Sequence, residues 1–168
     1  YKFCIINYGD TILDCKLRDV EYGGDLGKVL FSYDNSNLLK TFYTEYKYFY
    51  GQKVNTDDFF EKSDPYGKTC GDSFFSIPAR STIENKIAKK DTTFIGSWLG
   101  SASVEKQAYA IEALLRIKKS GTQLNSRQKR LIDFLKNKDD IVSTCSGCTT
   151  MGVPMKKAIK QIDYEQQD

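Results

Sequence analysis

The sequence contains no histidine among its 168 residues. Histidine is the only side chain whose unperturbed pKa lies close to neutral, and it is the commonest metal ligand and general base. Its absence excludes Ser-His-Asp and Cys-His catalytic machinery, together with every zinc site that needs an imidazole ligand. Most classes of hydrolase are therefore excluded for this chain.

Long hydrophobic runs are also missing, and no segment approaches the roughly 20 apolar residues that span a bilayer. With 40% hydrophobic and 28% charged residues, the composition is that of a globular protein rather than a disordered one. Tryptophan occurs once, whereas eleven tyrosines and ten phenylalanines gather mainly before residue 76. We expect a single domain over 1–168, with an aromatic-rich, acidic part (1–76), a helical stack (77–164) and a frayed tail (165–168).

The chain begins with Tyr1 rather than methionine, as expected of a protein whose signal peptide has been removed. Five cysteines in a chain of this length fit an oxidising compartment, where disulfides persist, and their odd number leaves one outside any pair. We therefore expect a periplasmic or secreted protein.

Hydrophobic periodicity predicts five helices, and capping residues mark where several of them begin. Ser81-Thr-Ile-Glu84 matches a capping box, Ser103 precedes the most regular run, and Asn125 or Ser126 caps the next. Pro154 stands at the favoured first position of a last helix. The predicted helices cover residues 37–50, 81–90, 104–119, 126–137 and 154–163.

Short links between amphipathic helices place neighbouring helices antiparallel to each other. The predicted fold is therefore mainly α, an antiparallel helical-hairpin stack of the HEAT type, in which Trp98 fills a space between helices. The stretch 19–37 is expected to be a loop because glycine and asparagine punctuate it. Strands are expected only in a small N-terminal β-hairpin and at residues 140–144.

In the N-terminal hairpin, Gly9-Asp10 forms a two-residue turn and Tyr8 pairs with Thr11. This register places Cys4 directly opposite Cys15, at about 5.5 Å between Cα atoms, which is within the span of a disulfide. A buried pair of reduced cysteines is the alternative.

Cys145-Ser-Gly-Cys148 fits three kinds of site. A redox pair needs its first cysteine at a helix N-terminus, yet the next helix is expected only from Pro154. A structural zinc site needs four ligands, and Cys70 supplies only a third. The interpretation that we favour is a structural staple, formed either by Cys145 with Cys148 or by one of the two with Cys70.

Charge is distributed unevenly along the chain. Residues 1–75 carry 9 basic and 12 acidic side chains, whereas residues 104–138 carry 9 basic and 3 acidic ones. Such a helix face is most often simply solvated, but it also suits docking of an acidic partner protein. Nucleic acid is the weaker candidate, because aromatic residues do not interleave with the basic run. Six basic residues gather where two predicted helices meet: Arg116, Lys118, Lys119, Arg127, Lys129 and Arg130.

The span 108–148, "AYAIEALLRIKKSGTQLNSRQKRLIDFLKNKDDIVSTCSGC", resembles the C-terminal part of small secreted helical proteins of Bacteroidetes-type bacteria. Some small proteins of this kind in Gram-negative bacteria are immunity proteins, which neutralise toxins delivered by neighbouring cells. The resemblance implies a binding protein of the cell envelope whose partner is a toxin or effector.

Two functions from different classes are consistent with the sequence. The first is a non-enzymatic, protein-binding protein of the bacterial envelope, which needs no cofactor or metal and uses the six basic residues to contact an acidic partner. An immunity protein is its most concrete form. The second is an enzyme of the thiol-disulfide oxidoreductase type, which would use Cys145 and Cys148.

Overall fold

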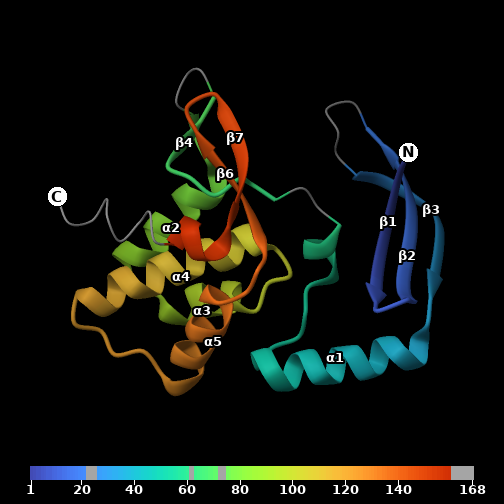
Figure 1. The fold of residues 1–168 in the computed structure, drawn as a ribbon, viewed down its shortest axis with the longest axis horizontal. Helices are drawn as coiled ribbons and strands as arrows, with labels where there is room; N and C mark the ends of the chain where they lie inside the picture. Colours follow the sequence, from blue (N-terminus) through green and yellow to red (C-terminus); the bar gives the residue numbers. More distant parts are fainter. Residues whose placement is uncertain (22–25, 61–62, 72–74, 160–168) are drawn as a thin grey trace. The chain divides into compact units, whose positions relative to one another are not determined.

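The structure, a computed structural model, describes residues 1–21, 26–60, 63–71 and 75–159. Of these residues, 47% are helical and 28% lie in strands. The prediction of a mainly α fold is therefore wrong. The chain forms two compact units, Tyr1–Lys62 and Ser63–Asp168, which are drawn in Figure 1.

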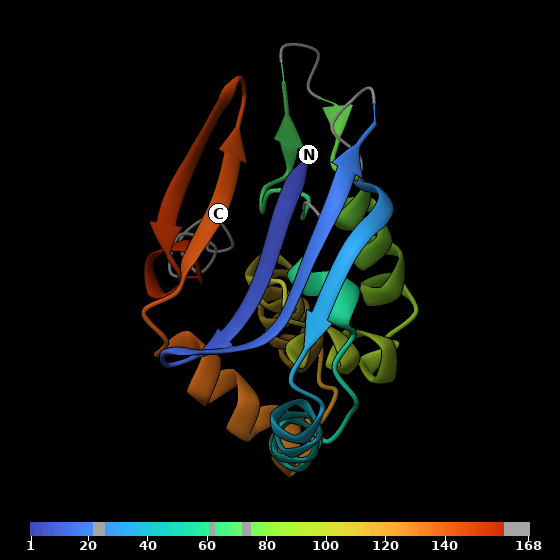
Figure 2. The same cartoon turned by 90° about the vertical axis from the view of Figure 1, so that its right-hand side faces the viewer.

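The first unit contains a three-stranded antiparallel sheet in the order β1-β2-β3 and one long helix. Its elements are β1 (Lys2–Tyr8), β2 (Thr11–Val20), β3 (Leu26–Asp34), α1 (Ser36–Tyr50) and the 3₁₀ turn η1 (Thr56–Phe59). Figures 1 and 2 show α1 crossing the end of the sheet at which β1 turns into β2 and β3 stops. Asn35 caps α1 and Gly51, with φ of 73°, ends it.

Strand β3 lies where the sequence pattern predicted a loop. Two irregularities in its pairing with β2, on either side of Arg18, break the alternation of inward and outward residues. Apolar side chains therefore follow one another at Val29, Leu30 and Phe31, and the period of two that identifies a strand is lost. Pairing with β2 decides the structure of this segment.

The predicted turn of the N-terminal hairpin is confirmed, but the predicted pairing of its cysteines is wrong. Tyr8 does pair with Thr11, yet a register shift between Ile6 and Asn7 places Cys4 opposite Lys16 and Cys15 opposite Ile5. Because successive strand residues point to opposite faces, the two cysteines lie on opposite faces of the sheet. Both are buried and reduced.

The core of the first unit lies between the sheet and α1. Its buried members are Cys4, Ile6, Leu13, Leu39 and Phe60, and Phe42 and Tyr43 pack against them. The opposite face of the sheet carries the paired rows Ile5–Cys15–Tyr33 and Phe3–Leu17–Phe31. Phe3 and Phe31 are each more than half exposed. Many of the rings in this part of the chain are therefore outside the core.

The second unit combines four helices with two β-hairpins. The helices are α2 (Pro78–Ala88), α3 (Thr92–Leu99), α4 (Val104–Lys119) and α5 (Ser126–Lys136), and residues 155–159 are helical as well. The hairpins pair β4 (Thr69–Cys70) with β5 (Phe75–Ser76), and β6 (Ile141–Ser146) with β7 (Thr149–Pro154). The predictions for residues 160–168, which cover the end of the last helix and the frayed tail, lie outside the described residues.

Helix α4 lies at the centre of this unit, with its bounds and its Ser103 cap as predicted. It contacts α2, α3 and β6, and this enclosure buries more than one apolar stripe. Tyr109, Ile111 and Leu114 are completely buried, and Glu112 is 6% exposed. The hydrophobic stripe in the sequence therefore predicts fewer buried residues than α4 has in the folded unit.

Two other helices depart from their predictions. Helix α2 begins at Pro78 rather than at 81, and its cap residue is Ile77, so the Ser81 capping box does not form. Helix α3 was not predicted, and Trp98 lies on it rather than between helices. With eight residues, one of them Gly96, α3 is too short to show a periodicity, although Asp91 caps it with a bond from the Phe94 backbone N–H.

A disulfide between Cys70 and Cys145 ties the β4 segment to β6, with 5.5 Å between Cα atoms. Next to it, Tyr66 donates its backbone N–H to Ser143 O at 2.7 Å and accepts from Cys145 N at 2.9 Å. The predicted structural staple is confirmed in the form that uses Cys70, and Cys148 takes no part in the bond.

Candidate binding site

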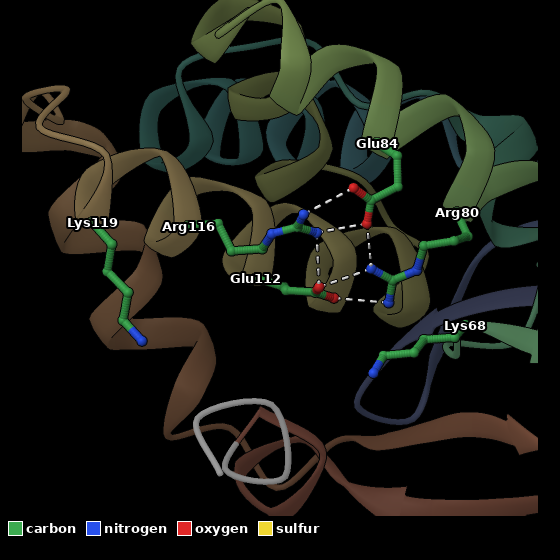
Figure 3. Close-up of a pocket in the computed structure, with 6 residues that line it drawn as sticks. All are labelled: Lys68, Arg80, Glu84, Glu112, Arg116 and Lys119. Atoms are coloured by element: carbon green, nitrogen blue, oxygen red, sulfur yellow. Dashed lines mark hydrogen bonds and ion pairs between the residues drawn. The ribbon is translucent and has the colours of Figure 1, made fainter. Parts of the chain in front are cut away.

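Four charged side chains join α2 to α4 in the second unit (Figure 3). Each helix supplies one arginine and one glutamate a single turn apart, in opposite order: Arg80 and Glu84 on α2, Glu112 and Arg116 on α4. Arg80 donates two hydrogen bonds of 2.8 Å to Glu112. Arg116 likewise binds both oxygens of Glu84, at 2.6 and 2.9 Å.

Weaker diagonal contacts close the cluster. Arg80 reaches Glu84 at 3.2 Å, and Arg116 reaches Glu112 at 3.3 Å. Every carboxylate therefore binds two guanidinium groups, and the four side chains together carry no net charge. Hydrogen bonds from the two arginines make the Glu84 carboxylate a poor proton acceptor. The arrangement cross-links two helices rather than preparing an acid or base.

Two tyrosines enclose the buried end of the cluster. Tyr66 donates its hydroxyl to Glu112 at 2.9 Å, and Arg80 donates its Nε–H to Gly67 O at 2.9 Å. The Arg80 guanidinium lies 4.8 Å from the ring centroid of Tyr109, within the range of a cation–π contact. Tyr109 itself donates to Pro65 O at 2.9 Å. The segment of residues 65–67 is thereby fastened to α4.

The surroundings shift the pKa of Tyr66, Tyr109, Glu84 and Arg80, each in the direction that preserves its charge state at neutral pH. Burial raises the pKa of Tyr109 to about 12, and burial followed by the nearby Glu112 charge raises the pKa of Tyr66 further. Hydrogen bonds from Arg116 hold the pKa of Glu84 below its ordinary value. Burial would lower the pKa of Arg80, but the hydrogen bonds and charge of Glu112 raise it above its ordinary value. The two tyrosines therefore stay neutral at neutral pH, and Glu84 and Arg80 stay charged.

A hollow of about 370 Å³ opens beside the cluster. The four clustered side chains line it together with Lys68 and Lys119. Figure 3 shows the two lysines on either side of Glu112, Lys119 at the end of α4 and Lys68 on the segment leading to β4. Among the described residues that line the hollow, the four clustered side chains sum to zero formal charge and the two lysines add two positive charges.

The structure places the six predicted basic residues in two kinds of surroundings. Arg116 belongs to the ion-pair cluster, and Lys119 is exposed at the edge of the hollow. The remaining four are exposed, one at the end of α4 and three at the start of α5: Lys118, Arg127, Lys129 and Arg130. We call these four residues and Lys119 the basic surface.

The positions of the cysteines differ from those that a redox pair or a zinc site requires. Cys145 lies on β6, bonded to Cys70, and Cys148 lies in the turn between β6 and β7, where it is exposed. Cys4 and Cys15 are in the sheet of the first unit. Within the described ranges, no three His, Cys, Asp or Glu side chains gather as metal ligands would.

The sequence did not indicate that four of the residues lining the hollow are neighbours: Lys68, Arg80, Glu84 and Glu112. One signal was present: Arg80 and Glu84 have the spacing i, i+4, and Glu112 and Arg116 have the same spacing with the charges reversed. Two such complementary pairs suit facing helices. Nothing local indicates that α2 and α4 are the helices that meet.

No protein-family model, curated protein or solved structure matches this chain. Among the helices in the described part of the chain, none is both long and apolar enough to cross a membrane.

Proposed function

We propose that the chain is a non-enzymatic protein of the bacterial cell envelope that binds a partner protein with an acidic contact surface. An immunity protein that neutralises a toxin is the most specific form of this proposal. It draws on the resemblance of residues 108–148 and on the polarised charge of the chain. The Cys70–Cys145 disulfide supports a compartment outside the reducing cytoplasm.

The observation that carries the proposal is the charge at the start of α5. The first turn of this helix contains Arg127 and Lys129 and no acidic residue. The N-terminus of a helix has a partial positive charge, so a cation there costs about 0.3–1 kcal/mol where an anion would be stabilising. Both side chains are exposed. An acidic partner would offset this local repulsion and would be drawn to the surface by it.

Lys118 and Lys119 extend the same surface at the end of α4, where cations complement the helix dipole. The link between the two helices spans only residues 120–125. The basic surface therefore combines two favourably placed lysines with basic residues whose position is unfavourable for the free protein. This combination favours a docking surface over a merely solvated one.

The test begins with a pull-down of the protein from its own organism, followed by binding kinetics with the partner obtained. The variant Arg127→Glu/Lys129→Glu should slow association markedly and weaken its salt dependence, because steering acts on the association rate. Its melting temperature should not fall, since the new carboxylates suit the start of α5. The matched control is Lys40→Glu/Lys47→Glu, which changes the net charge equally on exposed positions of α1.

Equal association rates for the two variants at low salt would contradict the proposal. The thiol-disulfide alternative is tested by insulin reduction with Cys148→Ser as the control. Activity that is lost in this variant would replace the binding role by an enzymatic one.

A further inference from the structure

We propose that the outer face of the three-stranded sheet, which is the face opposite to the core of the first unit, is a contact surface between two copies of this chain. The sequence concentrates its aromatic residues before residue 76, and this face carries several that the core does not use. The inference uses no residue of the basic surface, so it does not depend on the proposed function.

The outer face consists of two rows of side chains that cross all three strands. The strand pairing forms the rows Phe3–Leu17–Phe31 and Ile5–Cys15–Tyr33. None of these six side chains is charged, and none belongs to the core cluster between the sheet and α1. Four of the six residues are about half exposed: Phe3 (58%), Phe31 (54%), Tyr33 (48%) and Ile5 (46%). The face is therefore a continuous apolar surface that the first unit does not cover with side chains of its own core.

The exposed area suits a contact between proteins. A large ring presents about 200 Å² when it is fully exposed, so four half-exposed residues present about 400 Å². On a monomer, the largest apolar patch of roughly this size is often functional. Two such faces would bury about 800 Å² between them, and the neighbouring groups of the strands bring the total toward the roughly 1,000 Å² at which specific interfaces begin. We therefore expect a weak dimer that dissociates on dilution.

Charge and shape favour a second copy over the acidic partner protein. Complementary charge selects an acidic partner, and this face offers no charged group. In a dimer with twofold symmetry the same patch supplies both sides, and an uncharged patch meets itself without repulsion. Two sheets pack face to face with their side chains interdigitated. The larger side chains lie on β1 and β3, with the smaller Cys15 and Leu17 between them on β2, so large side chains of one copy can pack over β2 of the other.

Sedimentation equilibrium of the full chain, over about a hundredfold range of concentration, tests for the dimer. We expect the average mass to rise with concentration from that of one chain toward that of two. Phe3→Lys/Phe31→Lys should weaken dimerisation by about tenfold or more, because the contact would bury cations without partners. The matched control is Leu38→Lys/Tyr48→Lys, which makes the same change of charge at exposed positions of α1 and should dimerise as the wild type does.

A second measurement needs no variant. In a mixture of isotope-labelled and unlabelled chains, filtered NOE spectra detect only contacts between copies, and we expect them from the rings of Phe3, Phe31 and Tyr33. These contacts decide the question if Phe3→Lys/Phe31→Lys does not fold, as judged by circular dichroism. A chain that stays monomeric throughout the range would overturn the proposal, as would a dimer that survives in the folded variant or contacts between copies confined to other residues. The basic surface is tested separately, by Arg127→Glu/Lys129→Glu.

Discussion

Arg80 and Glu112 form a two-bond ion pair, with both N···O distances at 2.8 Å, although each residue is more than nine-tenths buried. Removing one partner of a buried pair leaves an uncompensated charge, whereas replacing both by apolar residues is often neutral or stabilising. The pair thus makes the contact between α2 and α4 selective: the two helices fit only when both charges are present, or when both are absent.

The first prediction follows from this asymmetry. Glu112→Gln should lower the free energy of unfolding by about 3 kcal/mol, because Arg80 loses its main counter-charge in a buried place. Arg80→Met/Glu112→Leu should be less destabilised than Glu112→Gln alone. Urea unfolding of the three proteins measures this. A double variant that loses as much stability as Glu112→Gln, or more, would show that the pair does not act as a unit.

The second prediction concerns pH and the outer ion pair. Arg116 holds the pKa of Glu84 below the ordinary value of 4.5. A carboxyl group with a lowered folded-state pKa stabilises the protein above its ordinary pKa, and this contribution is lost as the pH falls through the lowered value. The difference in unfolding free energy between wild type and Glu84→Gln should therefore shrink between neutral pH and about pH 3. Glu45→Gln, on the exposed side of α1, serves as the control, and an equal pH dependence for both variants would contradict the prediction.

The third prediction concerns the disulfide. Cys70 and Cys145 are separated by 75 positions in the sequence. Closing a loop of this size restricts the unfolded chain, so Cys70→Ser/Cys145→Ser should lose about 4 kcal/mol. Cys148→Ser, which leaves the bond intact, should change stability by less than about 0.5 kcal/mol. Thiol titration supplies a second check, because only Cys148 is exposed among the three cysteines outside the bond. Rapid labelling of all three without denaturant would contradict the structure.

The fourth prediction concerns Gly67. A Cβ atom at this position would lie 2.2 Å from the backbone oxygen of Cys145, so the two segments must move apart. Gly67→Ala should cost about 1–3 kcal/mol, since it strains the backbone bonds between Tyr66 and β6. Gly96→Ala on α3 is the comparison: there the Cβ meets only the end of the Gln128 side chain, at 3.2 Å, and no backbone atom. The gain in helix propensity, about 1 kcal/mol, should offset that contact. Equal losses in chemical denaturation would refute the close approach at Gly67.

Local sequence signals determined the local structure of several elements. The Ser103 cap and the bounds of α4, the Asn125 cap of α5, and the turn that pairs Tyr8 with Thr11 could all be predicted. Each depends on bonds between residues a few positions apart, so a short stretch of sequence contains every group involved. Ser81 shows the limit of such signals: its capping pattern was present, yet Pro78 and the preceding chain started the helix earlier.

Tertiary structure decided the features that depend on distant partners. Strand β3 exists because β2 offers it a pairing edge, and the bulge after Ile6 separates Cys4 from Cys15. The ion pair between Arg80 and Glu112 joins residues 32 positions apart, and the disulfide joins residues 75 apart. The composition of the sequence determined which chemistry is missing, above all that of histidine, and its caps and turns determined where several elements begin. Only packing determined which charges meet and which cysteine bonds to Cys145, because these choices depend on which surfaces the folded chain brings together.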